Sequence, residues 1–117
     1  MAGQAQAEAK AKQHTITLEV KDGKFSYRDQ DDNDAEKKHA KHQESIGWKS
    51  KGKQEFTVDF GKSWPFAGFP VVLTSVNGEI PPRQVAVNPK VETKYKYTVT
   101  MPPYTPDDPE IIIDPSE

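Results

Sequence analysis

Cysteine is absent from the 117-residue chain. Disulfide bonds, thiolate metal sites and cysteine nucleophiles are therefore excluded. A strong excess of one charge is absent too: 16 basic and 18 acidic side chains are interspersed and give a net charge of −2. Nucleic-acid binding requires many phosphate-neutralising Lys and Arg side chains, so we expect no nucleic-acid partner.

Large apolar side chains are scarce as well, because hydrophobic residues make up only 33% of the chain. No apolar run approaches the roughly 18 residues that a membrane-spanning helix needs, so we expect no membrane span. The first residues, MAGQAQAEAKAK, also lack the apolar stretch of a secretory signal. As written, the sequence predicts a cytoplasmic protein; a periplasmic or secreted one would require that a signal peptide had been removed.

The scarcity of apolar side chains is uneven along the chain. Residues 1–13 and 29–44 contain no Ile, Leu, Val or aromatic residue, whereas the remainder has enough of them to bury a core. We expect residues 1–13 to form a flexible N-terminal tail and residues 14–117 to form a single domain with a polar insertion at 29–44. The second half of this insertion, Asp34–Glu44, is compatible with a short helix capped by Asp34.

Elsewhere, apolar and polar residues alternate with the period of two that is typical of half-buried strands. Ile16, Leu18 and Val20 begin the pattern. Asp22-Gly23 then predicts a tight hairpin turn, because both residues tolerate the positive φ angles that this turn needs. Further apolar runs follow at 25–27, 46–48, 56–60, 71–76, 85–87, 94–101 and 111–113.

Short runs at this spacing predict an all-β fold, namely a seven- to eight-stranded Greek-key β-sandwich. We expect Pro81-Pro82 to stiffen a loop between two of the strands. The closing run, Ile111–Ile113, is the strongest candidate for an exposed sheet edge. Its neighbours Glu110 and Asp114 are typical of protection against unwanted strand pairing.

Several segments carry a resemblance to a known fold family. They are the opening hairpin ITLEVKDGKFSY, the tryptophan strand IGWKS, FTVDF followed by SWPF, the penultimate strand YKYTV and the closing strand PEIIID. In this order, over residues 14–114, they resemble the cupredoxin-like β-sandwiches, most closely small uncharacterised bacterial members. They resemble the immunoglobulin-like sandwiches more loosely.

The resemblance implies the fold of this family but not its copper chemistry. In copper-carrying cupredoxins, the loop between the last two strands supplies Cys, His and usually Met ligands. The corresponding stretch here, MPPYTPDD, offers only Met101. Blue-copper sites need the cysteine thiolate for their bonding and redox properties, so we expect no cofactor.

Histidines in the polar insertion suggest metal binding as an alternative function. His39 and His42 are three residues apart and would face the same side of a helix, which is the geometry of a two-ligand metal site. His14, just before the first strand, is a candidate third ligand. In the simpler interpretation, these are solvated side chains of a mobile loop.

The acidic start of the insertion resembles part of a calcium-binding loop. Asp29, Asp31 and Asn33 match its first three ligand positions, but the positions that require Gly and Glu hold Asp34 and Ala40. An EF-hand is therefore excluded. The cluster Asp29–Asp34 remains a candidate for weak calcium binding of another kind, beside the simpler interpretation of a solvated acidic loop.

Aromatic residues in the Pro/Gly-rich loops are the main candidates for ligand binding. Trp64, Phe69 and Tyr104 could anchor a protein partner or stack on a sugar. We expect Trp48 and Phe66 to be buried in the core instead. The sequence thus also leaves open a carbohydrate-binding module.

No catalytic motif is recognisable: the chain has no G-x-S-x-G, no H-E-x-x-H and no Gly-rich loop that opens a helix. We therefore predict a non-catalytic binding or interaction module. Its expected partner is another protein, bound through the loop aromatics or by strand addition at an exposed edge. We expect the chain itself to be a monomer.

Overall fold

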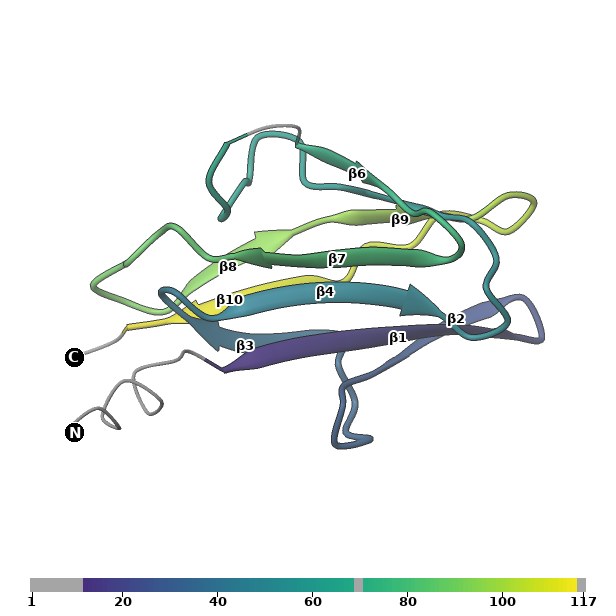
Figure 1. Cartoon of the computed structure of the whole chain (residues 1–117), viewed down its shortest axis with the longest axis horizontal. Helices are drawn as coiled ribbons and strands as arrows, with labels where there is room; N and C mark the ends of the chain where they lie inside the picture. Colours follow the sequence, from purple (N-terminus) through teal and green to yellow (C-terminus); the bar gives the residue numbers. More distant parts are fainter. Residues whose placement is uncertain (1–11, 69–70, 116–117) are drawn as a thin grey trace, which may run out of the picture.

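The alternating segments of the sequence become extended strands in the computed structural model, which describes residues 12–68 and 71–115 (Figure 1). Within these ranges the chain forms ten strands and no helix, hence none that could cross a membrane. The strands are β1 (Gln13–Lys21), β2 (Lys24–Arg28), β3 (Lys37–Lys41), β4 (Ser45–Ser50), β5 (Thr57–Asp59), β6 (Val72–Thr74), β7 (Glu79–Gln84), β8 (Thr93–Lys96), β9 (Thr98–Thr100) and β10 (Glu110–Asp114). The all-β prediction is thus confirmed for the described residues. The predicted flexible tail lies outside them, except for Lys12 and for Gln13, which begins β1.

The strands form three hydrogen-bonded sheets, in the orders β2-β1-β4-β7, β3-β10-β8 and β6-β5-β9. The last two sheets continue one another, because only Tyr97 separates β8 from β9. At this junction the N–H of Tyr97 donates to the carbonyl of Pro109, and Val99 forms a bridge with Asp107. Figure 1 shows the first sheet in front of this second layer, which is a sandwich-like arrangement.

Large side chains from both layers fill the space between them. Trp48 of β4 is buried and makes edge-to-face contacts with Phe60 and Phe66, at centroid distances of 6.0 and 6.2 Å. Its indole N–H donates to the hydroxyl of Tyr97, 3.2 Å away in the opposite layer. A buried N–H needs such a partner, so this bond joins the layers without leaving a polar atom unsatisfied. The expected burial of Trp48 and Phe66 is confirmed.

The predicted hairpin at Asp22-Gly23 is also confirmed. These two residues have φ angles of 55° and 77°, and they connect the antiparallel strands β1 and β2. Positive φ at both positions is what a two-residue hairpin turn with the twist of the flanking strands requires. The local sequence is therefore sufficient to determine this turn.

The helix considered for Asp34–Glu44 is wrong, because Lys37–Lys41 form strand β3. This strand runs parallel to β10 and is hydrogen-bonded along its whole length to Glu110–Asp114. β3 is an edge strand and contributes little apolar surface to the core. Ala40 points into the core, while Lys37, His39 and Lys41 are exposed. Pairing with a distant apolar strand has overridden the local preference of a lysine-rich segment.

The assignment of Ile111–Ile113 to a sheet edge is wrong as well. Strand β10 lies between β3 and β8, and all three isoleucines are at most 4% exposed. Ile111 and Ile113 point into the core, and Ile112 on the outward face lies between His39 of β3 and Lys94 of β8. An apolar run without alternation is thus compatible with a strand that has neighbours on both edges.

The loop expected at Pro81-Pro82 is in fact part of β7, which is an edge strand. Opposite these prolines, the register with β4 shifts between Ile46 and Trp48, so two residues of β7 face the single residue Gly47. A Cβ atom at Gly47 would lie 2.9 Å from the backbone nitrogen of Pro82. Prolines lack the N–H of a regular ladder, and the bulge accommodates them at an edge.

The predicted number of seven to eight strands is too small for two reasons. The polar segment contributes the additional strand β3, and the run at 94–101 is divided at Tyr97 into β8 and β9. The two parts pair with different neighbours: β8 with β10, and β9 with β5. Continuous alternation in the sequence did not indicate this change of partner.

The central position of β10 gives a test of the fold. Replacing the fully buried Ile113 by alanine should lower the free energy of unfolding by about 2–5 kcal/mol, because it leaves a cavity between the layers. Urea denaturation measures this loss. The matched control is Val91→Ala, whose side chain is 69% exposed and should matter little. Equal, small effects of the two changes would contradict the central placement of β10.

Candidate metal centre

The outward face of the sheet β3-β10-β8 brings together charged residues from three distant parts of the chain. Strand alternation leaves every second side chain on this face. From β10 these are Glu110, Ile112 and Asp114. Their partners across the ladders are Lys37, His39 and Lys41 on β3, and Lys96 and Lys94 on β8.

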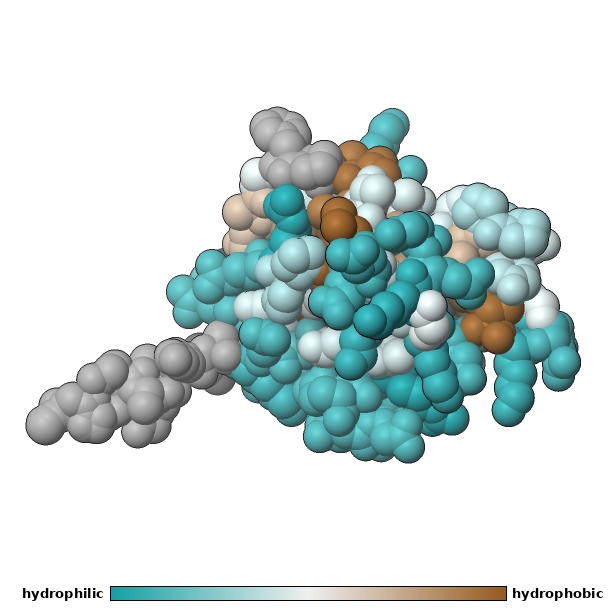
Figure 2. All heavy atoms as spheres, turned by 45° about the vertical axis from the view of Figure 1, so that its right-hand side comes forward, coloured by the Kyte–Doolittle hydropathy of each residue, from teal (hydrophilic) through white to brown (hydrophobic). Residues whose placement is uncertain are grey.

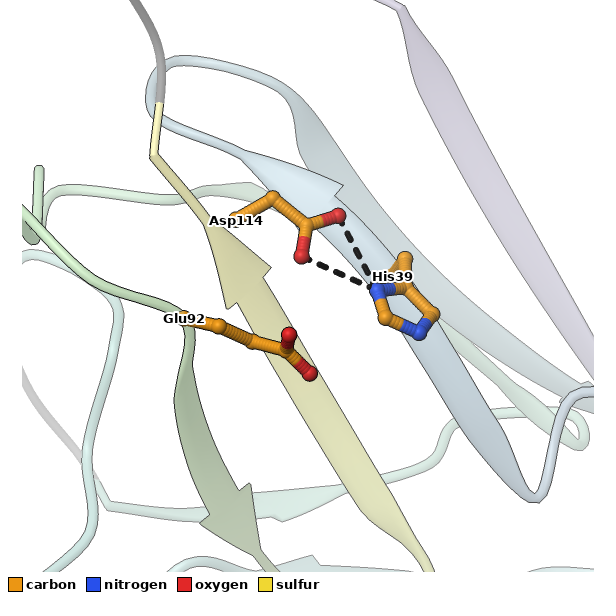
Figure 3. Close-up of side chains that lie close together, drawn as sticks. All are labelled: His39, Glu92 and Asp114. Carbon is orange, nitrogen blue, oxygen red and sulfur yellow. Dashed lines mark hydrogen bonds and ion pairs between the residues drawn. The ribbon is translucent and has the colours of Figure 1, made fainter.

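Three potential metal ligands meet at one end of this face, as Figure 3 shows. They are His39 from β3, Asp114 from the end of β10, and Glu92 from the residue before β8. One ligand atom from each lies within 4.8 Å of the other two. Among the described residues, no other group of three His, Cys, Asp or Glu side chains is this close.

One direct contact already joins two of these groups. The Nδ1 atom of His39 lies 3.0 and 2.9 Å from the two carboxylate oxygens of Asp114. A carboxylate can only accept, so this bond requires a proton on Nδ1 of the imidazole. A metal ion bound at Nδ1 would take the place of that proton between the two side chains.

The second carboxylate of the group, that of Glu92, has no hydrogen bond or ion pair to any other residue of the described ranges. It nevertheless lies beside the carboxylate of Asp114. Two negative charges at this separation repel each other, and no ion pair of Glu92 with a described residue offsets this repulsion. A divalent cation placed between the three side chains would remove this repulsion.

The ligand types indicate which metals fit. One imidazole and two carboxylates suit divalent transition metals such as Zn²⁺, whereas Ca²⁺ and Mg²⁺ prefer oxygen ligands throughout. Ligand atoms of tetrahedral zinc lie about 3.4 Å apart, given metal–ligand distances of about 2.0–2.2 Å. The group must therefore close by roughly an ångström. Its side chains can rotate to do so, because that of His39 is 53% exposed.

The structure brings His39 together with Glu92 and Asp114 rather than with His14 and His42. His14 is buried at the start of β1, and its Nε2 atom lies 2.8 Å from a carboxylate oxygen of Glu44. The same oxygen accepts the N–H of Lys41, so this contact holds the turn between β3 and β4. His42 lies in that turn, where the helical spacing argument no longer applies.

The acidic cluster Asp29–Asp34 is a hydrogen-bonded turn. One carboxylate oxygen of Asp29 accepts the backbone N–H groups of Asp31 and Asn33, and the other lies 2.8 Å from Nζ of Lys38. Burial by itself raises the pKa of Asp29, but the bond to Lys38 and the two N–H bonds outweigh it and lower the pKa to about 2. These contacts already occupy the carboxylate that calcium would need.

The aromatic residues singled out for binding are partly buried. Trp64 packs against Phe60 and Phe66, donates its indole N–H to the carbonyl of Gly68, and has the guanidinium of Arg83 5.9 Å from its ring centroid. Tyr104 is half-buried and contacts the edge of Phe25. Phe69 lies outside the described residues. The two described rings therefore contribute to packing as well as to the surface.

A polar hollow of about 750 Å³ lies on the outward face of the other sheet. Its lining includes Thr15 and Thr17 of β1, Lys49 of β4 and the turn around Lys51. No aromatic residue of the described ranges lines it. Sugar recognition relies on ring stacking, so this hollow gives no support to a carbohydrate site.

The stretch MPPYTPDD, where the resemblance to cupredoxins placed the expected copper loop, lies at the opposite end of β10 from Asp114. Met101, its only candidate ligand, is buried and belongs to the core. In Figure 1 this loop and the C-terminal end of β10 are at opposite ends of the molecule. The candidate metal centre is thus a separate location.

Sequence reasoning identified His39 but missed Glu92 and Asp114. Asp114 appeared only as protection of a strand edge, and Glu92 not at all. They become neighbours because β10 pairs with β3 on one side and with β8 on the other. No spacing in the sequence indicates that pairing, although Asp114 directly follows the predicted strand 111–113 and Glu92 lies two residues before the predicted strand 94–101.

No protein-family model matches the chain, and no curated protein is significantly similar to it.

The lowered pKa of Asp29 gives a pH-dependent prediction. Its contribution to the free energy of unfolding should be complete above pH 4 and should disappear as the pH falls towards 2, because only the ionised carboxylate holds Lys38 and the turn. Asp29→Asn should therefore cost about 1–2 kcal/mol at neutral pH and progressively less below pH 4. Urea titrations from pH 7 to 2 measure this. An effect of Asp29→Asn that stays the same from pH 7 to pH 2 would refute the assigned role of this carboxylate.

Proposed function

We propose that the chain is a non-catalytic binding module whose ligand is a divalent transition metal ion, held by His39, Glu92 and Asp114. The main support for this proposal is that the three side chains come from three separate segments and have ligand atoms within 4.8 Å of one another. His39 and Asp114 lie on the paired strands β3 and β10, and Glu92 directly precedes β8, which pairs with β10. The order β3-β10-β8 therefore brings the three backbones together. The imidazole favours a transition metal over Ca²⁺.

We further propose a cupredoxin-like fold for this module. The closing strand β10 is hydrogen-bonded to β8, in which the segment YKYTV of the resemblance begins. The parallel pairs β1–β4 and β3–β10 also support this assignment, because the sheets of the immunoglobulin fold are antiparallel. A Greek-key connection of the strands belongs to the same proposal. The metal, however, would lie away from the family's copper loop.

A non-catalytic role is supported by the openness of the site. The side chain of His39 is 53% exposed and that of Asp114 is 29% exposed. Catalytic sites strengthen electrostatic interactions by excluding water, and a strand face of this kind does not do so. Binding, rather than turnover, fits this environment.

Protein binding through loop aromatics has less support than metal binding. Trp64 and Tyr104 are half-buried, and both pack against core residues. The side of the molecule visible in Figure 2 is mostly hydrophilic, with apolar side chains in small separate patches. Isolated patches of this kind are normal on a monomer and do not require a partner.

Isothermal titration of the purified chain with Zn²⁺ tests the proposed function. We expect one saturable site, and His39→Ala, Glu92→Gln and Asp114→Asn should each weaken it at least about tenfold. The matched control is His42→Ala, which removes a nearby histidine outside the group. Zinc at 100 times its Kd should also stabilise the fold by about 2.7 kcal/mol, because it binds only the assembled site. Equal losses in His39→Ala and His42→Ala, or no saturable binding, would refute the proposal.

The metal should compete with protons for the same side chains. Binding at Nδ1 of His39 displaces the proton that now bridges to Asp114. On a neutral imidazole this proton moves to Nε2, whereas a doubly protonated imidazole must release one proton. The apparent affinity for Zn²⁺ should therefore fall as the pH is lowered, with proton release at the acidic end of the titration range. Titrations in buffers of different ionisation enthalpy measure the protons released. The His39→Ala variant should release fewer, and an equal release would contradict the assigned ligand.

A further inference from the structure

The candidate metal centre lies on a face that also carries four exposed lysines. These are Lys37 and Lys41 on β3, and Lys94 and Lys96 on β8. None of the four makes an ion pair with a described residue. Their ammonium groups are therefore available to a negatively charged ligand.

The ladder register divides these lysines into two pairs. Lys37 and Lys96 flank Glu110, which is their direct partner on either side. At the other end of the face, Lys41 is the partner of Asp114, and Lys94 is the partner of Ile112. This second pair borders the metal ligands, and Glu110 is not its direct partner.

A bound metal would change the charge of the whole face. The four lysines together with Glu92, Glu110 and Asp114 give it one net positive charge when His39 is neutral. A divalent ion raises this to three. Since Glu92 and Asp114 would then be bound to the metal, their charge would no longer offset Lys41 and Lys94.

The coordination of the metal would also be incomplete. The chain supplies three ligands, whereas Zn²⁺ takes at least four, and a site with three protein ligands leaves a position for water or an external ligand. Oxygen atoms of an anion can fill this position. The exposure of the site gives such an anion free access from solvent.

We propose that the metal-loaded face binds a small free oxyanion, a phosphate or a carboxylate. One anion oxygen would complete the metal coordination, and Lys41 and Lys94 would bind the remaining charge. This inference rests on the proposed metal site and adds the external anion that the bound metal would take. Metal and anion then bind cooperatively: the anion has no comparable affinity for the metal-free face, because flexible surface lysines alone hold it weakly.

Titration of inorganic phosphate into the full chain, with and without one equivalent of Zn²⁺, tests the inference by calorimetry at constant ionic strength. We expect saturable phosphate binding only in the presence of the metal. Acetate, titrated in the same way, shows whether a carboxylate is accepted in place of phosphate. Replacing Lys41 and Lys94 together by glutamine should weaken phosphate binding at least about fivefold. The metal affinity of this variant should stay equal or rise, because two repelling charges are lost. The control Lys49→Gln, on the other sheet, should leave both affinities unchanged.

The other outcomes are distinct from one another. Phosphate binding of equal strength without zinc, or unchanged binding in the lysine variant, overturns the inference and leaves the metal site standing. Zinc binding without saturable binding of phosphate or acetate also overturns the inference and leaves the metal site standing. If the wild-type chain binds no zinc, the inference and the proposed function both fail.

Discussion

Strand β10 is hydrogen-bonded on both edges, and the second layer of the molecule depends on this double pairing. Its three consecutive isoleucines are buried, and two of them face the space between the layers. Burial on this scale stabilises the strand sufficiently to order the lysine-rich segment beside it. Without β10, β3 would have no partner in the sheet. The candidate metal centre is a consequence of the same pairing, since its three residues belong to the three neighbouring segments.

Local features of the sequence predicted much of the fold because they act over a few residues. The turn at Asp22-Gly23 and the strands around it depend on backbone preference and on alternation alone. The burial of Trp48 followed from the size of its side chain in a small β core. Such features are independent of which strands become neighbours, so they are readable before the topology is known.

The predictions of the fold that were wrong concern features that depend on long-range strand pairing. A run such as Lys37–Lys41 has no strand pattern of its own, and only the parallel contact with β10 makes it extended. Likewise, the contact between His39 and Asp114 joins residues 75 positions apart. His39 was noticed for its spacing from His42 on a helix that does not form, so its place in the candidate site does not follow from that spacing. Predicting the group requires the order β3-β10-β8 in advance.

The bulge opposite Gly47 has a consequence for the behaviour of the chain in a crowded solution. An open sheet edge with regular N–H and carbonyl groups is a template on which other chains can grow into aggregates. In β7 two adjacent residues, Pro81 and Pro82, have no N–H to offer, and the bulge disrupts the spacing of those around them. A strand of another chain that paired with the open edge of β7 would therefore form an interrupted hydrogen-bond ladder. The proline pair thus acts as a gatekeeper on this side of the molecule.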